Sequence, residues 1–168
     1  KTSFSDDIRV TVSKAGDPTE ITWRYETPVG TITRRRIWEE ACYSWAISGW
    51  GIQTEQDLAV FTYIFSNMKF SPNFELYESW KSAVGDAGVV YNQLPYSGMG
   101  SLLNYWMGVE RTLIATYDWP EAMHEAVDQY NTNLLKCVDL LCDSSAEIIL
   151  MGDNFSSDVQ PPAFFQKW

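Results

Sequence analysis

The chain has 168 residues, 45% of them hydrophobic and 15% aromatic, which is enough apolar surface for the core of one soluble, folded domain. Its 22 acidic and 12 basic side chains give a net charge of −10, which argues against binding to nucleic-acid phosphates or to an anionic membrane surface. Its three cysteines have no CxxC or Cys/His spacing, so a zinc site is not expected. We also expect neither a membrane span nor a secretory leader, and therefore reduced thiols in a cytoplasmic protein.

The first forty residues have the alternation of antiparallel strands. Apolar and polar residues alternate over residues 8–12 and again over residues 21–25, on either side of a turn at residues 14–18, and this pattern predicts a hairpin. A second turn at residues 27–30 leads into a third extended run at residues 31–36. We therefore expect a three-stranded antiparallel meander that forms a flap inserted into the main fold.

Three consecutive arginines, Arg34, Arg35 and Arg36, end this flap and allow two interpretations. They would suit a carboxylate-rich substrate, because guanidinium groups bind carboxylates in a bidentate manner. Alternation along a strand would instead turn neighbouring side chains to opposite faces, where pairing with the excess of acidic residues is sufficient. The sequence favours solvated strand charges.

After residue 50 the apolar periodicity becomes helical. Thr54 and Asp57 have the spacing of a capping box, and apolar residues at helical spacing follow as far as Phe65. A Ser-Pro-Asn break then precedes a second, shorter helix around Tyr77.

Two apolar strands are expected further along, with helices between them. Residues 89–91 predict one buried strand, and residues 147–151 predict another. The clearest helix precedes the second strand: Asp118 is its N-cap candidate, Pro120 lies in its first turn, and an apolar stripe continues to Leu141. A strand, helix, strand order is typical of a parallel α/β fold, in which both strands end on one rim.

Polar residues follow the second strand, at the position where barrel enzymes carry out their chemistry. Asp153 could accept hydrogen bonds from a substrate, and Asn154 could both donate and accept. The same two residues could instead form an Asx turn and cap backbone amides before the next helix. The residues alone leave both roles open.

Two segments carry a resemblance to a known family. The first is LPYSGMGSLLNYWMGVE, residues 94–110, in which a Pro-aromatic stretch leads to a helix that ends near Gly-Glu. The second is AEIILMGDNFSSDVQPPAFFQKW, residues 146–168, in which a strand ends in an acidic residue and a polar loop before a Pro-aromatic helix start. Together they resemble the middle of the uroporphyrinogen decarboxylase superfamily, which includes porphyrinogen decarboxylases and methylcobalamin:thiol methyltransferases.

The resemblance implies an α/β fold, a partial (β/α)8 TIM barrel over residues 41–168, with the antiparallel meander of residues 1–40 as an insertion. The block RYETPVGTITRRR is similar to a leader of methyltransferase-like members. We therefore expect a corrinoid-dependent methyltransferase acting on a thiol or small methylated substrate. Decarboxylation of tetrapyrrole side chains is the alternative, and a non-catalytic binding or carrier-docking module is an alternative of another class.

The expected site residues follow from the same resemblance. The catalytic candidates are Asp153 and Asn154, and the candidates for substrate binding are Tyr91, Tyr96, Ser97 and Tyr105. The tyrosine assignment rests on a tyrosine that lines the pocket in the family, and Tyr91 or Tyr96 after the first strand, or else Tyr105, could take that place.

The resemblance also bears on cofactors and partners. The family's substrate-gripping arginines and aspartate would precede Lys1, and its zinc ligands, a His-x-Cys and a later Cys, would follow Trp168. We thus expect an internal fragment that is inactive alone and holds no metal or cofactor, whereas zinc and methylcobalamin would belong to the full-length methyltransferase. The expected partners are a small-molecule, tetrapyrrole or corrinoid substrate, a corrinoid carrier protein, and a second copy of the chain in a homodimer.

Overall fold

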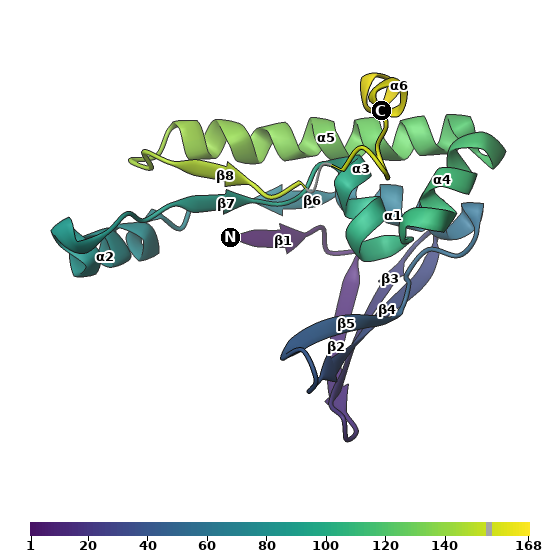
Figure 1. The fold of residues 1–168 in the computed structure, drawn as a ribbon, viewed down its shortest axis with the longest axis horizontal. Coiled ribbons are helices and arrows are strands. Elements are labelled where there is room, and N and C mark those ends of the chain that lie inside the picture. The colour runs from purple at the N-terminus through teal and green to yellow at the C-terminus, as the bar shows by residue number, and fades with distance from the viewer. Residues whose placement is uncertain (154–155) are drawn as a thin grey trace.

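A computed structural model describes residues 1–153 and 156–168 (Figure 1). These residues form a mixed α/β structure with three small sheets and no closed barrel. The strands are β1 (Thr2–Phe4), β2 (Arg9–Ala15), β3 (Glu20–Thr27), β4 (Gly30–Glu39), β5 (Ser44–Gly49), β6 (Met68–Phe70), β7 (Asn92–Leu94) and β8 (Ile149–Met151). The helices are α1 (Glu55–Ser66), α2 (Phe74–Val84), η1 (Gly85–Ala87), α3 (Gly98–Ser101), η2 (Leu102–Trp106), α4 (Val109–Asp118), α5 (Pro120–Cys142) and α6 (Pro162–Lys167).

The predicted meander is confirmed, with one strand more than the sequence indicated. Strands β2 to β5 pair in chain order into an antiparallel sheet that projects from the helical part of the molecule (Figure 1). The sheet continues past residue 40 to Gly49 because β5 pairs with β4. The alternation of β5 is masked by a bulge: the register shifts between Arg35 and Arg36 of β4, which leaves an extra residue on β5.

The centre of the core lies between α1 and α5. The predicted capping box at the start of α1 is confirmed: Thr54 Oγ1 accepts from Asp57 N at 3.2 Å, and Asp57 Oδ2 accepts from Thr54 N at 2.9 Å. Phe61 of α1 is fully buried and its ring is stacked on that of Tyr130 of α5, with centroids 5.9 Å apart. This contact fixes the two helices side by side.

The N-cap predicted for the long helix is wrong by one residue. Asp118 ends α4, whereas α5 begins at Pro120 with Trp119 as its N-cap residue and without a side-chain cap. Proline suits this first position, because its missing N–H is one that a helix leaves unpaired in any case. The apolar stripe is confirmed, and α5 packs chiefly on α1 and, to a smaller extent, on α3, β6 and β7.

Strands β7 and β8 pair in parallel, so the prediction that both end on the same rim is confirmed. The predicted strand at residues 89–91 is displaced, because the ladder begins at Asn92. Burial is also less than expected: Tyr91 is 52% and Leu150 is 44% exposed. A parallel strand is buried only when elements cover it on both faces, and this ladder has two strands within the described residues.

Candidate functional site

A pocket lies between β4 of the meander and the residues that follow β7. Its volume is about 480 Å³, and its wall includes Tyr25, Arg34, Arg36, Tyr96, Tyr105 and Trp106. No aspartate or glutamate is among the described residues that line it. We call it the arginine pocket.

Strand alternation places two of the three consecutive arginines in this pocket. Arg34 and Arg36 are half-buried on one face of β4, whereas Arg35 is exposed on the other. The expected pairing with acidic residues holds for Arg35, whose Nη1 lies 3.7 Å from Glu20 Oε1. It fails for Arg34 and Arg36, which form no ion pair with a carboxylate in the described part of the chain.

Aromatic rings support both guanidinium groups. The Arg34 Cζ lies 4.6 Å from the ring centroid of Trp23 and 5.0 Å from that of Trp106, and the Arg36 Cζ lies 4.7 Å from that of Tyr105. The Nε atoms of both arginines are buried and find no hydrogen-bond acceptor among the described residues. Stacking therefore holds these cations in place without neutralising them.

The two arginines also influence each other electrostatically. Burial, which removes water from the guanidinium, lowers the pKa of Arg34 below its ordinary value. Tyr25 opposes this decrease in the Arg34 pKa, and the positive charge of Arg36 adds to it. Two like charges thus share one partly desolvated pocket.

A π-helical turn brings the remaining aromatic wall into the pocket. In η2 the Met107 N–H donates to Leu102 O, five residues earlier, at 2.9 Å. This wider turn carries Tyr105 and Trp106, and such turns are frequent at functional sites. Tyr105 meets Tyr96 edge to face, with ring centroids 5.1 Å apart. Two of the predicted substrate-binding tyrosines therefore lie together.

The other predicted site residues lie elsewhere. Ser97 N donates to Asp153 Oδ1 at 2.9 Å, and Ser97 Oγ accepts from Gly100 N at 3.1 Å, so both side chains cap backbone amides at the start of α3. Asp153 therefore caps a backbone amide, as one of the two interpretations of the sequence predicted. The amide belongs to the loop after β7 and not to the turn in which Asp153 itself lies. Tyr91 lines a separate groove beside α2, and Asn154 lies outside the described residues.

A buried hydroxyl pair forms the side of the arginine pocket toward α5. Ser101 Oγ donates to Tyr130 Oη at 2.9 Å. Burial raises the pKa of Tyr130; the Ser101 hydrogen bond partly opposes this, and the negative charge of Asp153 adds to it. The phenol of Tyr130 is therefore neutral at physiological pH and keeps its own proton available for donation.

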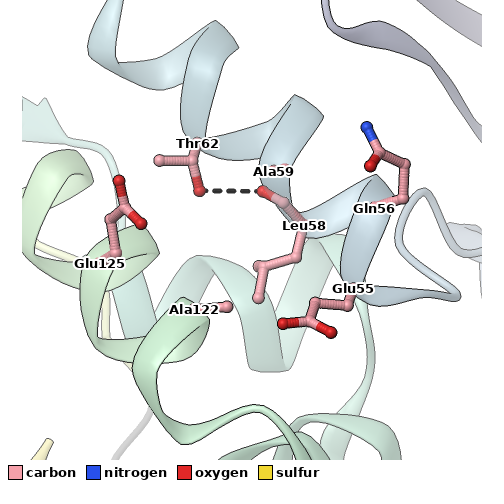
Figure 2. A pocket seen from close by; sticks show the side chains of 7 residues that line it. All are labelled: Glu55, Gln56, Leu58, Ala59, Thr62, Ala122 and Glu125. Atoms are coloured by element: carbon pink, nitrogen blue, oxygen red, sulfur yellow. Dashed lines mark hydrogen bonds between the residues drawn. The ribbon is translucent and has the colours of Figure 1, made fainter.

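A second pocket, of about 470 Å³, lies between α1 and α5 (Figure 2). Its two carboxylates lie apart in Figure 2, with Glu125 of α5 at the left and Glu55 of α1 below the centre. Its hydroxyl is already used, since Thr62 Oγ1 donates to Leu58 O at 2.9 Å. The arginine pocket is the better candidate because two charged groups that line it, Arg34 and Arg36, have no carboxylate partner among the described residues.

Sequence reasoning underestimated Arg34 and Arg36. A partial signal was present, because Trp23 and Tyr25 alternate along one strand as Arg34 and Arg36 do along its neighbour, and the register places Trp23 opposite Arg34. The contribution of Trp106 had no comparable signal, since it depends on the π-helical turn.

The comparisons with known proteins add no relative: no protein-family model, no curated protein and no solved structure matches this chain. Within residues 1–153 and 156–168, no helix is long and apolar enough to cross a membrane. The same residues contain no group of three His, Cys, Asp or Glu side chains that could hold a metal ion.

Proposed function

We propose that this chain is part of a (β/α)8 barrel enzyme similar to the uroporphyrinogen decarboxylase superfamily, with its ligand bound in the arginine pocket and the meander as an insertion. One observation carries the proposal: the parallel strand β7 ends directly in the pocket, where Leu94, Pro95 and Tyr96 form part of the wall. In barrel enzymes the residues after the strands hold the substrate.

The proposed reaction is corrinoid-dependent methyl transfer to a thiol or from a small methylated substrate. The block RYETPVGTITRRR, similar to methyltransferase-like members, supports this reaction, as does a ring-lined pocket that suits a flat ligand. Zinc would hold a thiol as thiolate in such an enzyme. The described residues do not fit a zinc site by themselves, because they offer no group of three metal ligands.

Decarboxylation of an acidic tetrapyrrole side chain is the second candidate, favoured by the protonated phenol of Tyr130 in the pocket wall. Loss of carbon dioxide leaves an electron pair on the carbon that carried the carboxylate, and that carbon must gain a proton. Tyr130 could supply this proton while its oxygen accepts the hydrogen bond from Ser101.

The experiment is a paired assay of the protein as its gene encodes it. Demethylation of methylcobalamin in the presence of a thiol is followed by the change in cobalamin absorbance, and loss of carboxylates from uroporphyrinogen by chromatography of the oxidised porphyrins. We expect the first reaction, and we expect it to fall at least tenfold in Tyr96→Ala but not in Tyr117→Ala, whose side chain is 85% exposed and does not line the pocket. Turnover that is equal in both variants would contradict the placement of the site.

We also propose a homodimer and a docking contact with a corrinoid carrier protein. The exposed apolar residues of β8 and of the loop before β7 support an interface on that side, because parallel strands rarely stay uncovered. Sedimentation velocity over a hundredfold concentration range tests the dimer. Absence of turnover together with tight carrier binding would favour the non-catalytic docking module instead.

A further inference from the structure

We infer that Arg34 and Arg36 form a carboxylate-binding subsite, and that the ligand of the arginine pocket carries a carboxylate beside a planar unsaturated ring. The inference deepens the proposed function by naming a ligand class, and it rests on that function only in requiring a small ligand in this pocket. It requires neither of the two reactions.

The distribution of charge singles out these two side chains. The chain has 22 acidic residues against 12 basic ones, so an arginine has ample opportunity to pair with a carboxylate. Arg35, between the two, does so with Glu20. Arg34 and Arg36 instead face a pocket whose described wall contains no acidic side chain. An anion from outside the chain would supply the missing countercharge.

The geometry favours a carboxylate over a solvated counterion. Arg34 stacks on Trp23 and Trp106, and Arg36 stacks on Tyr105. These contacts restrict where the two guanidinium groups can lie. A guanidinium group that is already held in place loses less conformational entropy when it binds a planar anion through two parallel hydrogen bonds. Partial burial strengthens those hydrogen bonds, because less water competes for the donors.

The remaining wall defines the part of the ligand next to the carboxylate. Tyr25, Tyr96 and Tyr105 present ring faces and edges around the cations, and their phenols can act as hydrogen-bond donors. Flat rings pack well against such surfaces, and a pocket of about 480 Å³ lies within the range of small-molecule sites, roughly 300–1,000 Å³. A compact aliphatic acid would leave most of this aromatic surface uncovered.

The test compares two probes of nearly the same shape, 2-naphthoate and the neutral 2-naphthamide, in which an NH2 group replaces one carboxylate oxygen. Their affinities for the whole chain are measured by ligand-observed NMR and calorimetry, for the unaltered protein and for Arg34→Met, Arg36→Met and Arg35→Met. Methionine retains much of the apolar stem of arginine, and Arg35→Met removes a charge from the same strand on the opposite face. Thermal unfolding confirms that each variant folds. Arg36→Met is the safer variant should Arg34→Met not fold, because Arg36 stacks on a single ring.

We expect naphthoate to bind at least tenfold more tightly than naphthamide, and Arg34→Met or Arg36→Met to abolish this difference while Arg35→Met preserves it. Equal binding of both probes, unchanged in all three variants, would overturn the carboxylate subsite and leave a ligand pocket as proposed. A preference for naphthoate that Arg35→Met also removes would equally overturn it, because a general effect of charge would then suffice. Binding of neither probe would overturn both the subsite and the placement of the ligand in this pocket.

Discussion

Replacement of Gly100 by alanine tests whether the Asp153 carboxylate is held against α3. A Cβ built on Gly100 would lie 3.0 Å from Asp153 Cγ, still closer to Oδ1, and 3.1 Å from Ser97 Oγ. Because the carboxylate accepts the Ser97 N–H, the added methyl group would displace it and break that hydrogen bond. The effect should therefore depend on whether residue 153 carries a carboxylate.

Two opposing contributions set the magnitude. Alanine favours a helix over glycine by about 1 kcal/mol. Loss of a hydrogen bond to a charged group costs about 1.5–3 kcal/mol, and because Asp153 is only half-buried the lower part of this range applies. Gly100→Ala should thus destabilise the unaltered protein by roughly 1 kcal/mol. In Asp153→Ala, where the hydrogen bond is already absent, the same change should stabilise by up to about 1 kcal/mol.

The assay is urea unfolding, followed by tryptophan fluorescence, of the four proteins of this double-mutant cycle. We expect a coupling energy of about 2 kcal/mol between the two positions. Asp153→Asn serves as a control, because its amide oxygen can still accept from Ser97 and Gly100→Ala should remain destabilising in that background. Additive effects, with a coupling energy below about 0.5 kcal/mol, would refute the contact on which the capping role rests.

Two further predictions concern a helix start and a buried phenol. Thr54→Ala removes one half of the capping box at α1 and should lower the free energy of unfolding by about 1 kcal/mol, whereas Thr54→Ser should leave the urea midpoint nearly unchanged. Because burial raises the pKa of Tyr130, the folded state holds its phenol proton more tightly than the unfolded chain does. The resulting stability is fully present below about pH 10 and is lost as the pH rises through the folded-state value. Unfolding measured from pH 8 to 11 should therefore show a shallower alkaline loss in Tyr130→Phe, and identical slopes would contradict a raised pKa.

The features that the sequence predicted correctly are those with local causes. The hairpin alternation of β2 and β3 reflects which face of a strand is covered, and the Thr54 to Asp57 spacing reflects four unpaired N–H groups at a helix start. Both causes act within a few residues of the pattern. The parallel pairing of β7 with β8 also followed, since a helical connection between two strands favours it.

The features that the sequence did not predict depend on tertiary packing. An apolar run such as Ile148 to Met151 predicts burial only if something covers it, and its exposure here could not be read from the run itself. The fourth strand of the meander, β5, was not predicted because a bulge interrupts its alternation. For the site, Tyr96 and Tyr105 were identified and do meet, whereas the role of Arg34 and Arg36 required knowing which acidic residues come within reach.

Trp106 explains why the arginine pocket forms where meander and helices meet. Its ring lies 5.4 Å from that of Tyr25 in β3 and 5.4 Å from that of Phe61 in α1, while Arg34 stacks on it from the pocket side. Its backbone oxygen accepts from Ile52 N at 3.0 Å, and a Cβ on Gly51 would come within 2.7 Å of the ring. Gly51 and Ile52, which follow β5, thus also hold the indole in place. Because one rigid ring fixes both the sheet and the cation, the position of Arg34 is set before any ligand arrives, and this is the preorganisation that a specific binding site requires.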